Sequence, residues 1–228
     1  MKTIPIFIGY DPREAIAYHV CANSIIRNSS SPVSITPLAL NNFKDYSETH
    51  TDGSNQFIYS RFLVPHLMGY SGHAIFMDGD MIVRGDIAEL WAMREAGKDV
   101  QVVKHDYKTK MKEKYLGAKN EDYPRKNWSS VMIFNCNNFP TKKLTPEYIQ
   151  KSTGAHLHRF EWTTDERIGE LPKEWNWLPD EYGPNPNAKL LHYTLGTPSF
   201  HEFATTPMGD EWHRERIYTE YCQQRDIK

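Results

Sequence analysis

Two aspartates separated by a single glycine, Asp78 and Asp80, are the residues of this chain whose types and spacing most directly suggest chemistry. They follow the apolar run 74–77 and precede the apolar run 81–83, which predicts that both carboxylates lie at the end of a buried strand. Burying a carboxylate costs free energy unless a cation offsets its charge, and divalent metal ions prefer carboxylate oxygens as ligands. The pattern therefore favours a metal site, and it leaves open the alternative of a turn with solvated carboxylates.

Two further side chains could belong to the same site. His192 lies towards the end of an expected strand over 189–193, where a histidine is either a metal ligand or a hydrogen-bonded core residue. Arg61 lies in an expected helix over 56–67, and its guanidinium could hold a phosphate, orient one of the aspartates or form an ordinary salt bridge. Both are therefore candidates, and the spacing alone does not choose between these roles.

The elements that must position these residues alternate between strands and helices. Strands are predicted at 4–8, 33–40, 74–77, 81–83, 100–103, 131–134 and 189–193, and helices at 12–27, 56–67, 87–93, 165–170 and 210–224. Asp11 is expected to cap the first helix, with Pro12 at its first position, and Pro37 marks the second strand as an edge or a bulge. This alternation predicts an α/β domain with a largely parallel sheet, in which ligands bind at the carboxyl ends of the strands.

The composition is that of an ordinary soluble globular chain. Of its 228 residues, 39% are hydrophobic and 25% are charged, which suits a single domain. The net charge of -2 gives no support for a nucleic-acid partner, and no apolar run is long enough to span a bilayer. The first apolar run is expected to be a strand and not a signal peptide. Cys21, Cys136 and Cys222 lack metal-ligand spacing and favour a reducing cytoplasm as the location.

Several segments, taken together and in this order, resemble a known enzyme family. The clearest are 59–65 (YSRFLVP) and 75–87 (IFMDGDMIVRGDI), and the others are 8–11, 128–135, 165–176 and 192–196. The pattern is similar to glycosyltransferase family 8, the group of glycogenin and bacterial galactosyltransferases with the GT-A fold. The resemblance implies one GT-A, Rossmann-like domain over 1–228. Its nucleotide-binding half would be 1–104, and 105–228 would bind the sugar and the acceptor and end in a helix.

The same resemblance implies a metal-dependent transfer of a hexose, glucose or galactose, from a UDP-sugar to an acceptor that could be a glycan, a lipid or a protein, with retention of configuration. Negative charge builds on the departing diphosphate, and a divalent ion stabilises that charge. The implied metal ligands are Asp78, Asp80 and His192, a set that suits Mn²⁺ or Mg²⁺. The implied donor-binding residues are Gly9, Tyr10, Asp11, Arg13, Arg61, Asp78, Gly79, Ser130 and Gly196. The implied catalytic residues at the sugar are Asp165 and Glu166.

The chain departs from the family after Gly196, where it carries no counterpart of the family's phosphate-binding lysine. Arg13, Arg61 or Arg84 could compensate for that loss. The charged stretch 104–126 is either a lid or acceptor loop, or an ordinary solvated loop.

Two other classes of protein stay open. An aspartyl-nucleophile phosphatase also places paired aspartates after a strand, although such a pair normally lies near the start of the chain. A non-catalytic module could bind a nucleotide or a sugar with the same fold. Trapping an aspartyl-phosphate would identify the first class, and donor binding without release of a nucleoside diphosphate would identify the second.

Overall fold

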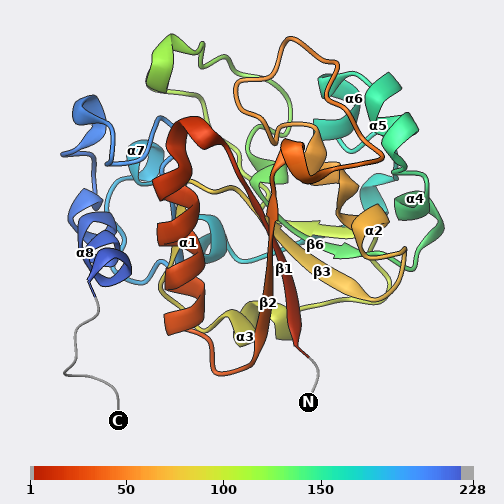
Figure 1. The fold of residues 1–228 in the computed structure, drawn as a ribbon, viewed down its shortest axis with the longest axis horizontal. Coiled ribbons are helices and arrows are strands. Elements are labelled where there is room, and N and C mark those ends of the chain that lie inside the picture. The colour runs from red at the N-terminus through yellow and green to blue at the C-terminus, as the bar shows by residue number, and fades with distance from the viewer. Residues whose placement is uncertain (1–2, 222–228) are drawn as a thin grey trace.

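A six-stranded sheet forms the centre of the molecule (Figure 1). The computed structural model describes residues 3–221, except for the side chain of Tyr115. Across the sheet the strands are β2 (Val33–Leu38), β1 (Ile4–Gly9), β3 (His73–Met77), β6 (Val131–Asn135), β5 (Val100–Val102) and β7 (Ile168–Glu170). Five of these strands run in one direction and β6 runs in the other. The predicted α/β domain with a mostly parallel sheet is confirmed.

Helices cover both faces of this sheet (Figure 1). One side carries α1 (Ala15–Arg27), which packs against α8 (Gly209–Glu220). The other side carries α2 (Val64–Leu67), α4 (Phe139–Lys142), α5 (Pro146–Lys151) and α6 (Gly154–His158). The remaining α-helices are α3 (Ile87–Ala92) and α7 (Pro179–Tyr182). Short 3-10 helices lie at Pro12–Glu14, Leu40–Asn42, Ser60–Leu63, Tyr115–Gly117, Trp128–Ser130, Asp165–Arg167, Lys173–Asn176 and His201–Phe203.

Alternate residues of the central strands serve two different cores. Phe7 of β1 and Phe76 of β3 are cross-strand neighbours in the core on one face. Ile6 and Ile75, one residue earlier in each strand, are neighbours in the core on the other face. Because both faces are covered, these strands are continuous apolar runs, without the alternation of apolar and polar residues that a half-exposed sheet shows.

A second, two-stranded sheet lies apart from the first. It pairs β4 (Met81–Val83) antiparallel with β8 (Leu190–His192), so that Met81 lies opposite His192. The sequence predicted both strands, but their pairing with each other depends on contacts between distant parts of the chain. β4 also packs against α1, which fixes the small sheet to the body of the domain.

Two predicted helices differ in the structure. The segment expected as a helix over 165–170 is a 3-10 turn followed by β7, because β7 finds hydrogen-bond partners on β5 that no local pattern shows. The segment expected as a helix over 56–67 is α-helical only in α2, where Pro65 lies in the first turn and needs no N–H. Helices α4, α5, α6 and α7 were not predicted.

The predictions made from the single residues Asp11 and Pro37 are confirmed. The side chain of Asp11 caps the first helical turn by accepting a hydrogen bond from the backbone N–H of Arg13. The strand that contains Pro37 is an edge strand of the sheet. The last helix ends at Glu220, and its expected extension to 224 lies outside the described residues.

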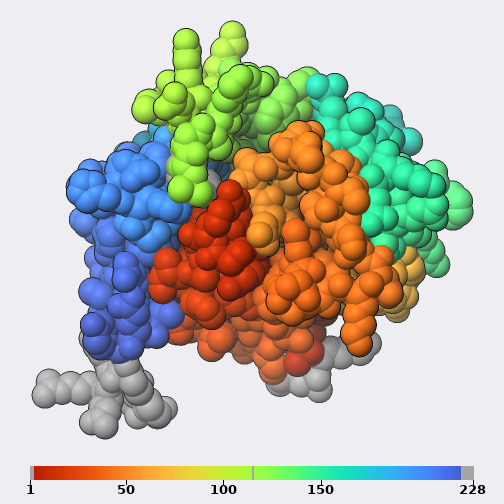
Figure 2. Space-filling model, turned by 45° about the horizontal axis from the view of Figure 1, so that its top comes forward, coloured from red at the N-terminus to blue at the C-terminus, as the bar shows by residue number. Residues whose placement is uncertain are grey.

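The carboxyl ends of the parallel strands meet at one edge of the sheet. In Figure 1, β1 rises from the N-terminus at the bottom of the view, so this edge lies towards the top. Segments 41–58 and 104–127 also lie there, and in Figure 2 the yellow-green 104–127 segment stands against orange and red residues of the first sixty positions. The surface above the carboxyl edge is therefore built from loops that are distant in sequence.

Candidate functional site

The two aspartates lie at the carboxyl edge, where the sequence predicted them. Asp78 directly follows β3, and its backbone N–H donates to the carbonyl of Ser130 at 3.0 Å. Gly79, between the two aspartates, passes close to the end of β1, because a Cβ atom built there would lie 2.5 Å from the carbonyl oxygen of Gly9. A Cβ atom on Gly9 would in turn lie 2.3 Å from the ring of Phe57. Both glycines are thus required by close packing beside the carboxylates.

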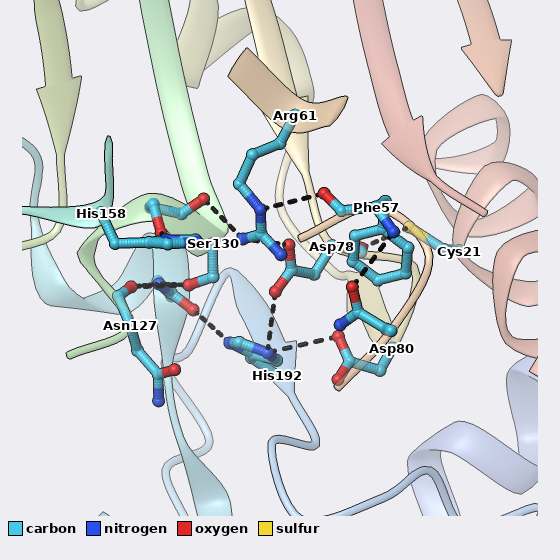
Figure 3. Close-up of polar contacts among 12 residues, drawn as sticks. Cys21, Phe57, Arg61, Asp78, Asp80, Asn127, Ser130, His158 and His192 are labelled. Carbon is cyan, nitrogen blue, oxygen red and sulfur yellow. Dashed lines mark hydrogen bonds and ion pairs between the residues drawn. The ribbon is translucent and has the colours of Figure 1, made fainter. Parts of the chain in front are cut away.

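The small second sheet brings His192 to the aspartates. Its pairing with Met81, together with a 3.1 Å hydrogen bond from the N–H of Tyr193 to the carbonyl of Asp80, holds the end of β8 beside the Asp-Gly-Asp turn. His192 Nε2 lies 3.2 Å from Asp80 Oδ1 and 3.8 Å from Asp78 Oδ2 (Figure 3). One ligand atom from each of the three residues fits within 4.8 Å of the others.

Arg61 lies on the other side of Asp78. Its Nη1 atom is 2.8 Å from Asp78 Oδ1 and also donates to the carbonyl of Ser129 at 2.9 Å, while Nε donates to the carbonyl of Phe57 at 3.3 Å (Figure 3). Burial raises the pKa of Asp78 to about 6; the Arg61 charge opposes this shift and the Asp80 charge adds to it. Arg61 therefore orients an aspartate, one of the three roles that its sequence position allowed.

The residues present fit a divalent cation. Two carboxylates and one imidazole converge, and within the described residues the buried Asp80 Oδ1 has His192 Nε2 at 3.2 Å beside it and no other hydrogen-bond donor. Buried carboxylate oxygens are costly when their charge is not offset, and a cation at this point would remove the cost. The donor set of two oxygens and one nitrogen suits Mn²⁺ or Mg²⁺.

Of the expected donor-binding residues at the end of β1, Tyr10 lines a cavity. Tyr10 and Tyr18 pack edge to face at 5.5 Å and border a cavity of about 560 Å³ at the carboxyl ends of β1 and β2, together with Asn41 and Gln56. The cavity therefore lies at the edge of the sheet where a ligand is expected to bind.

Asp11 and Arg13 are engaged with each other. Arg13 Nη2 lies 2.6 Å from Asp11 Oδ2 and donates to the carbonyl of Ser54, and Asp11 also accepts from the N–H of Gln56. Burial raises the pKa of Asp11, but the bonds from Arg13 and Gln56 outweigh it, so the pKa lies below its ordinary value. These two side chains fix the loop beside the cavity.

Ser130 and Gly196 are both buried. Ser130 lies close to Asp78 in space, and Gly196 lies close to His192 in the chain. Ser130 precedes β6, and its backbone carbonyl holds Asp78. Gly196 follows β8 and donates its N–H to the carbonyl of Tyr193 at 3.1 Å.

Asp165 and Glu166 lie in the 3-10 turn Asp165–Arg167, which precedes β7. The side chain of Asp165 is 76% exposed and pairs with Arg125 Nη2 at 2.6 Å. Among residues 3–221, no hydrogen bond or ion pair joins Asp165 or Glu166 to the three candidate metal ligands.

Residues that the sequence did not single out support the site. His158 lies 2.6 Å from Ser129 Oγ through Nδ1, and burial, followed by the nearby Arg61 charge, lowers its pKa to about 3, so it is a neutral imidazole. Asn176 contacts His192 Nδ1 at 3.0 Å. Each contact joins residues that are far apart in the chain, and no spacing or composition signal marks them.

The 104–127 segment is packed down onto the domain, and much of it is ordered by its own hydrogen bonds. Lys126 Nζ donates to Asn120 Oδ1 and to the carbonyl of Glu121, both at 2.6 Å, and the N–H of Lys110 donates to Glu181 on α7. Burial lowers the pKa of Lys114, and the negative charges of Asp80 and Asp78 partly oppose this shift by raising it. A cavity of about 550 Å³ lies between this segment and residues 51–58. The segment thus brings Lys114 to the neighbourhood of the aspartates.

Comparison with known proteins agrees with this fold and site. The model of glycosyl transferase family 8 matches residues 10–197. Protein CDI of Arabidopsis thaliana is 41% identical over 223 residues, which are 94% of this chain and 86% of that protein. Within residues 3–221, no helix has both the length and the apolar character needed to cross a bilayer.

Two solved structures share the fold at low identity. The galactosyltransferase LgtC in complex with donor and acceptor sugar analogs is 12% identical, with a TM-score of 0.62 over 97% of this chain and 98% of that chain. The apo form of the glycosyltransferase GlyE from Streptococcus pneumoniae TIGR4 is 15% identical, with a TM-score of 0.62 over 95% of this chain and 60% of that chain. The present chain therefore spans only about three fifths of GlyE.

The fold and the family match identify a glycosyltransferase of the GT-A class. Within that class the chain belongs to glycosyl transferase family 8, whose model covers most of its length.

Proposed function

We propose that this glycosyltransferase is metal-dependent and moves a hexose, glucose or galactose, from a UDP-sugar to a glycan, lipid or protein acceptor, with retention of configuration. The observation that carries the proposal is the convergence of Asp78, Asp80 and His192 at the carboxyl edge of the sheet. The cavity bordered by Tyr10 and Tyr18 supports a nucleotide site. It lies at the ends of β1 and β2 and offers aromatic and amide side chains to a ligand.

Each residue of the cluster has a distinct part. Asp78, Asp80 and His192 would hold Mn²⁺ or Mg²⁺, which when bound would offset the negative charge of a departing diphosphate. Arg61 keeps Asp78 ionised and fixed through the 2.8 Å ion pair. The lysines of the 104–127 segment, Lys114 foremost, add positive charge above the same edge, where the diphosphate of a donor would lie.

The assignment of Asp165 and Glu166 to the sugar stays a prediction, as does the division into a nucleotide-binding half at 1–104 and a sugar and acceptor half at 105–228. Asp165→Asn and Glu166→Gln test the first point. A role at the sugar predicts lost turnover with unchanged Mn²⁺ affinity, whereas a surface role predicts little change in either quantity.

A panel of nucleotide sugars tests the proposed function. Free nucleoside diphosphate is measured with UDP-, GDP-, ADP- and dTDP-sugars, in Mn²⁺ and in excess chelator. We expect release of UDP from UDP-glucose or UDP-galactose in Mn²⁺ alone. Release that persists in chelator would contradict metal dependence. Donor binding without release from any donor would instead favour the binding module.

A further inference from the structure

Asn176 forms a hydrogen-bonded link between the candidate metal ligand His192 and the start of β6. It ends the 3-10 helix Lys173–Asn176 and is fully buried. Its Oδ1 lies 3.0 Å from His192 Nδ1, and its Nδ2 lies 2.8 Å from Ser130 Oγ. Nothing in the expected chemistry of the site gives this amide a role.

The carbonyl of Asn127, at the end of this link away from His192, determines the direction of each hydrogen bond in it. Ser130 Oγ is 2.7 Å from the carbonyl of Asn127, and since a carbonyl only accepts, the Ser130 hydroxyl must donate to it. The hydroxyl can then accept from the amide nitrogen of Asn176, which also lies 3.4 Å from the same carbonyl. The amide oxygen of Asn176 is therefore the atom that faces His192.

An oxygen acceptor facing Nδ1 suits the one form of His192 that can bind a cation through Nε2. When a cation held by Asp78 and Asp80 takes the lone pair of Nε2, the ring proton must be on Nδ1, and Nδ1 then donates to Asn176 Oδ1. Nε2 points at Asp80 Oδ1 and Asp78 Oδ2, at 3.2 Å and 3.8 Å (Figure 3).

We propose that Asn176 is a positioning residue that holds His192 in the Nδ1–H tautomer and aims its Nε2 lone pair at a divalent cation. The proposal rests on the metal site of the proposed function. The amide oxygen is neutral, so it orients the imidazole without adding a third negative charge to a site that already buries two carboxylates. The hydrogen bonds through Ser130 to the carbonyl of Asn127 anchor this orientation in the 3-10 turn that precedes β6.

Nitrogen NMR of the Mg²⁺-loaded protein tests the hydrogen bond to Nδ1 directly, because Mg²⁺ is diamagnetic. Histidine is labelled with ¹⁵N, and the His192 signals are identified by their loss in His192→Gln. We expect a slowly exchanging Nδ1–H of His192 in the wild type and a rapidly exchanging one in Asn176→Leu, since that variant lacks the acceptor. An Nε2–H form in the Mg²⁺-loaded wild type would overturn the proposal.

Mn²⁺ affinity, measured by electron paramagnetic resonance without any donor sugar, tests the consequence. Asn176→Leu is expected to bind Mn²⁺ about 10- to 100-fold more weakly than the wild type. Asn176→Asp, which keeps an acceptor towards Nδ1, is expected to recover most of that loss. The matched control is Asn135→Leu, which removes another buried asparagine, one that binds the carbonyl of Ala96 at the far end of β6.

Asn135→Leu is expected to lower stability and to leave Mn²⁺ affinity unchanged. Equal Mn²⁺ affinities in Asn176→Leu and Asn135→Leu would overturn the proposal. A wild type that binds no Mn²⁺ would remove the metal site and the proposal with it. Mn²⁺ binding that responds to Asn176 without any sugar transfer would leave the proposal standing and would count against the proposed function alone.

Discussion

Arg61 and Asp78 form an ion pair in which both side chains are almost excluded from solvent, with 2.8 Å between Nη1 and Oδ1. The guanidinium also donates to two backbone carbonyls, so its position is fixed independently of the aspartate. A buried charge that loses its partner is strongly destabilising, whereas an exposed pair contributes little. The pair is therefore a structural support of the site as well as a source of positive charge.

Arg61→Ala should lower the free energy of unfolding by about 3–5 kcal/mol, because Asp78 is left buried without its cation. Urea denaturation of the metal-free protein measures this. Lys151→Ala, which breaks the exposed Glu147–Lys151 pair, is the control and should change stability little. Added Mn²⁺ should reduce the deficit of Arg61→Ala, since a bound cation can offset the same charge. Similar losses in the two variants would contradict the structural role of Arg61.

Asp80→Asn should reduce metal-dependent turnover by about 100-fold or more, because it removes a charged oxygen from the proposed metal site without changing side-chain size. Release of UDP at saturating donor measures this effect. Asp86→Asn, on the other side of β4, is the matched control: Asp86 caps α3, and asparagine is an equally good cap. Full activity in Asp80→Asn would rule out the proposed site.

Gly79→Ala should destabilise the protein by about 1–3 kcal/mol and weaken Mn²⁺ binding, because its new methyl group would lie 2.5 Å from the carbonyl oxygen of Gly9. Thermal unfolding and an Mn²⁺ titration measure the two effects. Gly97→Ala is the control, since a methyl group there would meet no atom within 4 Å. Gly97→Ala should be neutral or slightly stabilising. A neutral Gly79→Ala would show that the turn and the end of β1 can separate freely.

Asp99 should make stability depend on pH in acid. Its side chain is fully buried and binds Arg167, Thr163 and Asn138, with 2.6 Å between its Oδ1 and Arg167 Nη2. Burial raises the pKa of Asp99, but these hydrogen bonds outweigh it and place the pKa below the ordinary 3.8. A lowered folded-state pKa means that this contribution is complete above about pH 4 and is lost as the pH falls through the folded value.

The stability difference between wild type and Asp99→Asn should therefore be constant from pH 7 down to about pH 5 and should shrink at lower pH. Urea denaturation across this range measures it, and Asp45→Asn, at an exposed position, serves as the control. A difference that does not change with pH would mean that the charge of Asp99 makes no contribution.

Those parts of the fold and of the site that depend on local patterns could be predicted from the sequence. Apolar runs located most strands, Asp11 predicted its own cap, and Pro37 predicted an edge strand, because each signal acts within a few residues. The Asp-Gly-Asp turn was found for the same reason. β7 was missed, since a strand of three residues is defined by its pairing with β5 and not by its own composition.

The supporting contacts of the site could not be predicted in this way. Asn176 reaches His192 and Ser130, and His158 reaches Ser129, only because the folded chain brings these segments together. The resemblance to a family assigns Asp165 and Glu166 to the sugar, and this stays a prediction. The pairing of Asp165 with Arg125, 40 residues away in the chain, was likewise not visible in the sequence.

A cation bound beside the paired strands β4 and β8 would stabilise the folded state. Asp80 and His192 stand beside two strands that meet only after the chain between residues 83 and 190 has folded back on itself. A metal ion held by both would bind the native state and not the unfolded chain. It would add about 2.7 kcal/mol to the free energy of unfolding at a free concentration 100-fold above its dissociation constant. Depletion of divalent ions in a cell would then reduce the amount of folded protein, and with it the enzyme's lifetime against proteolysis, in addition to its turnover.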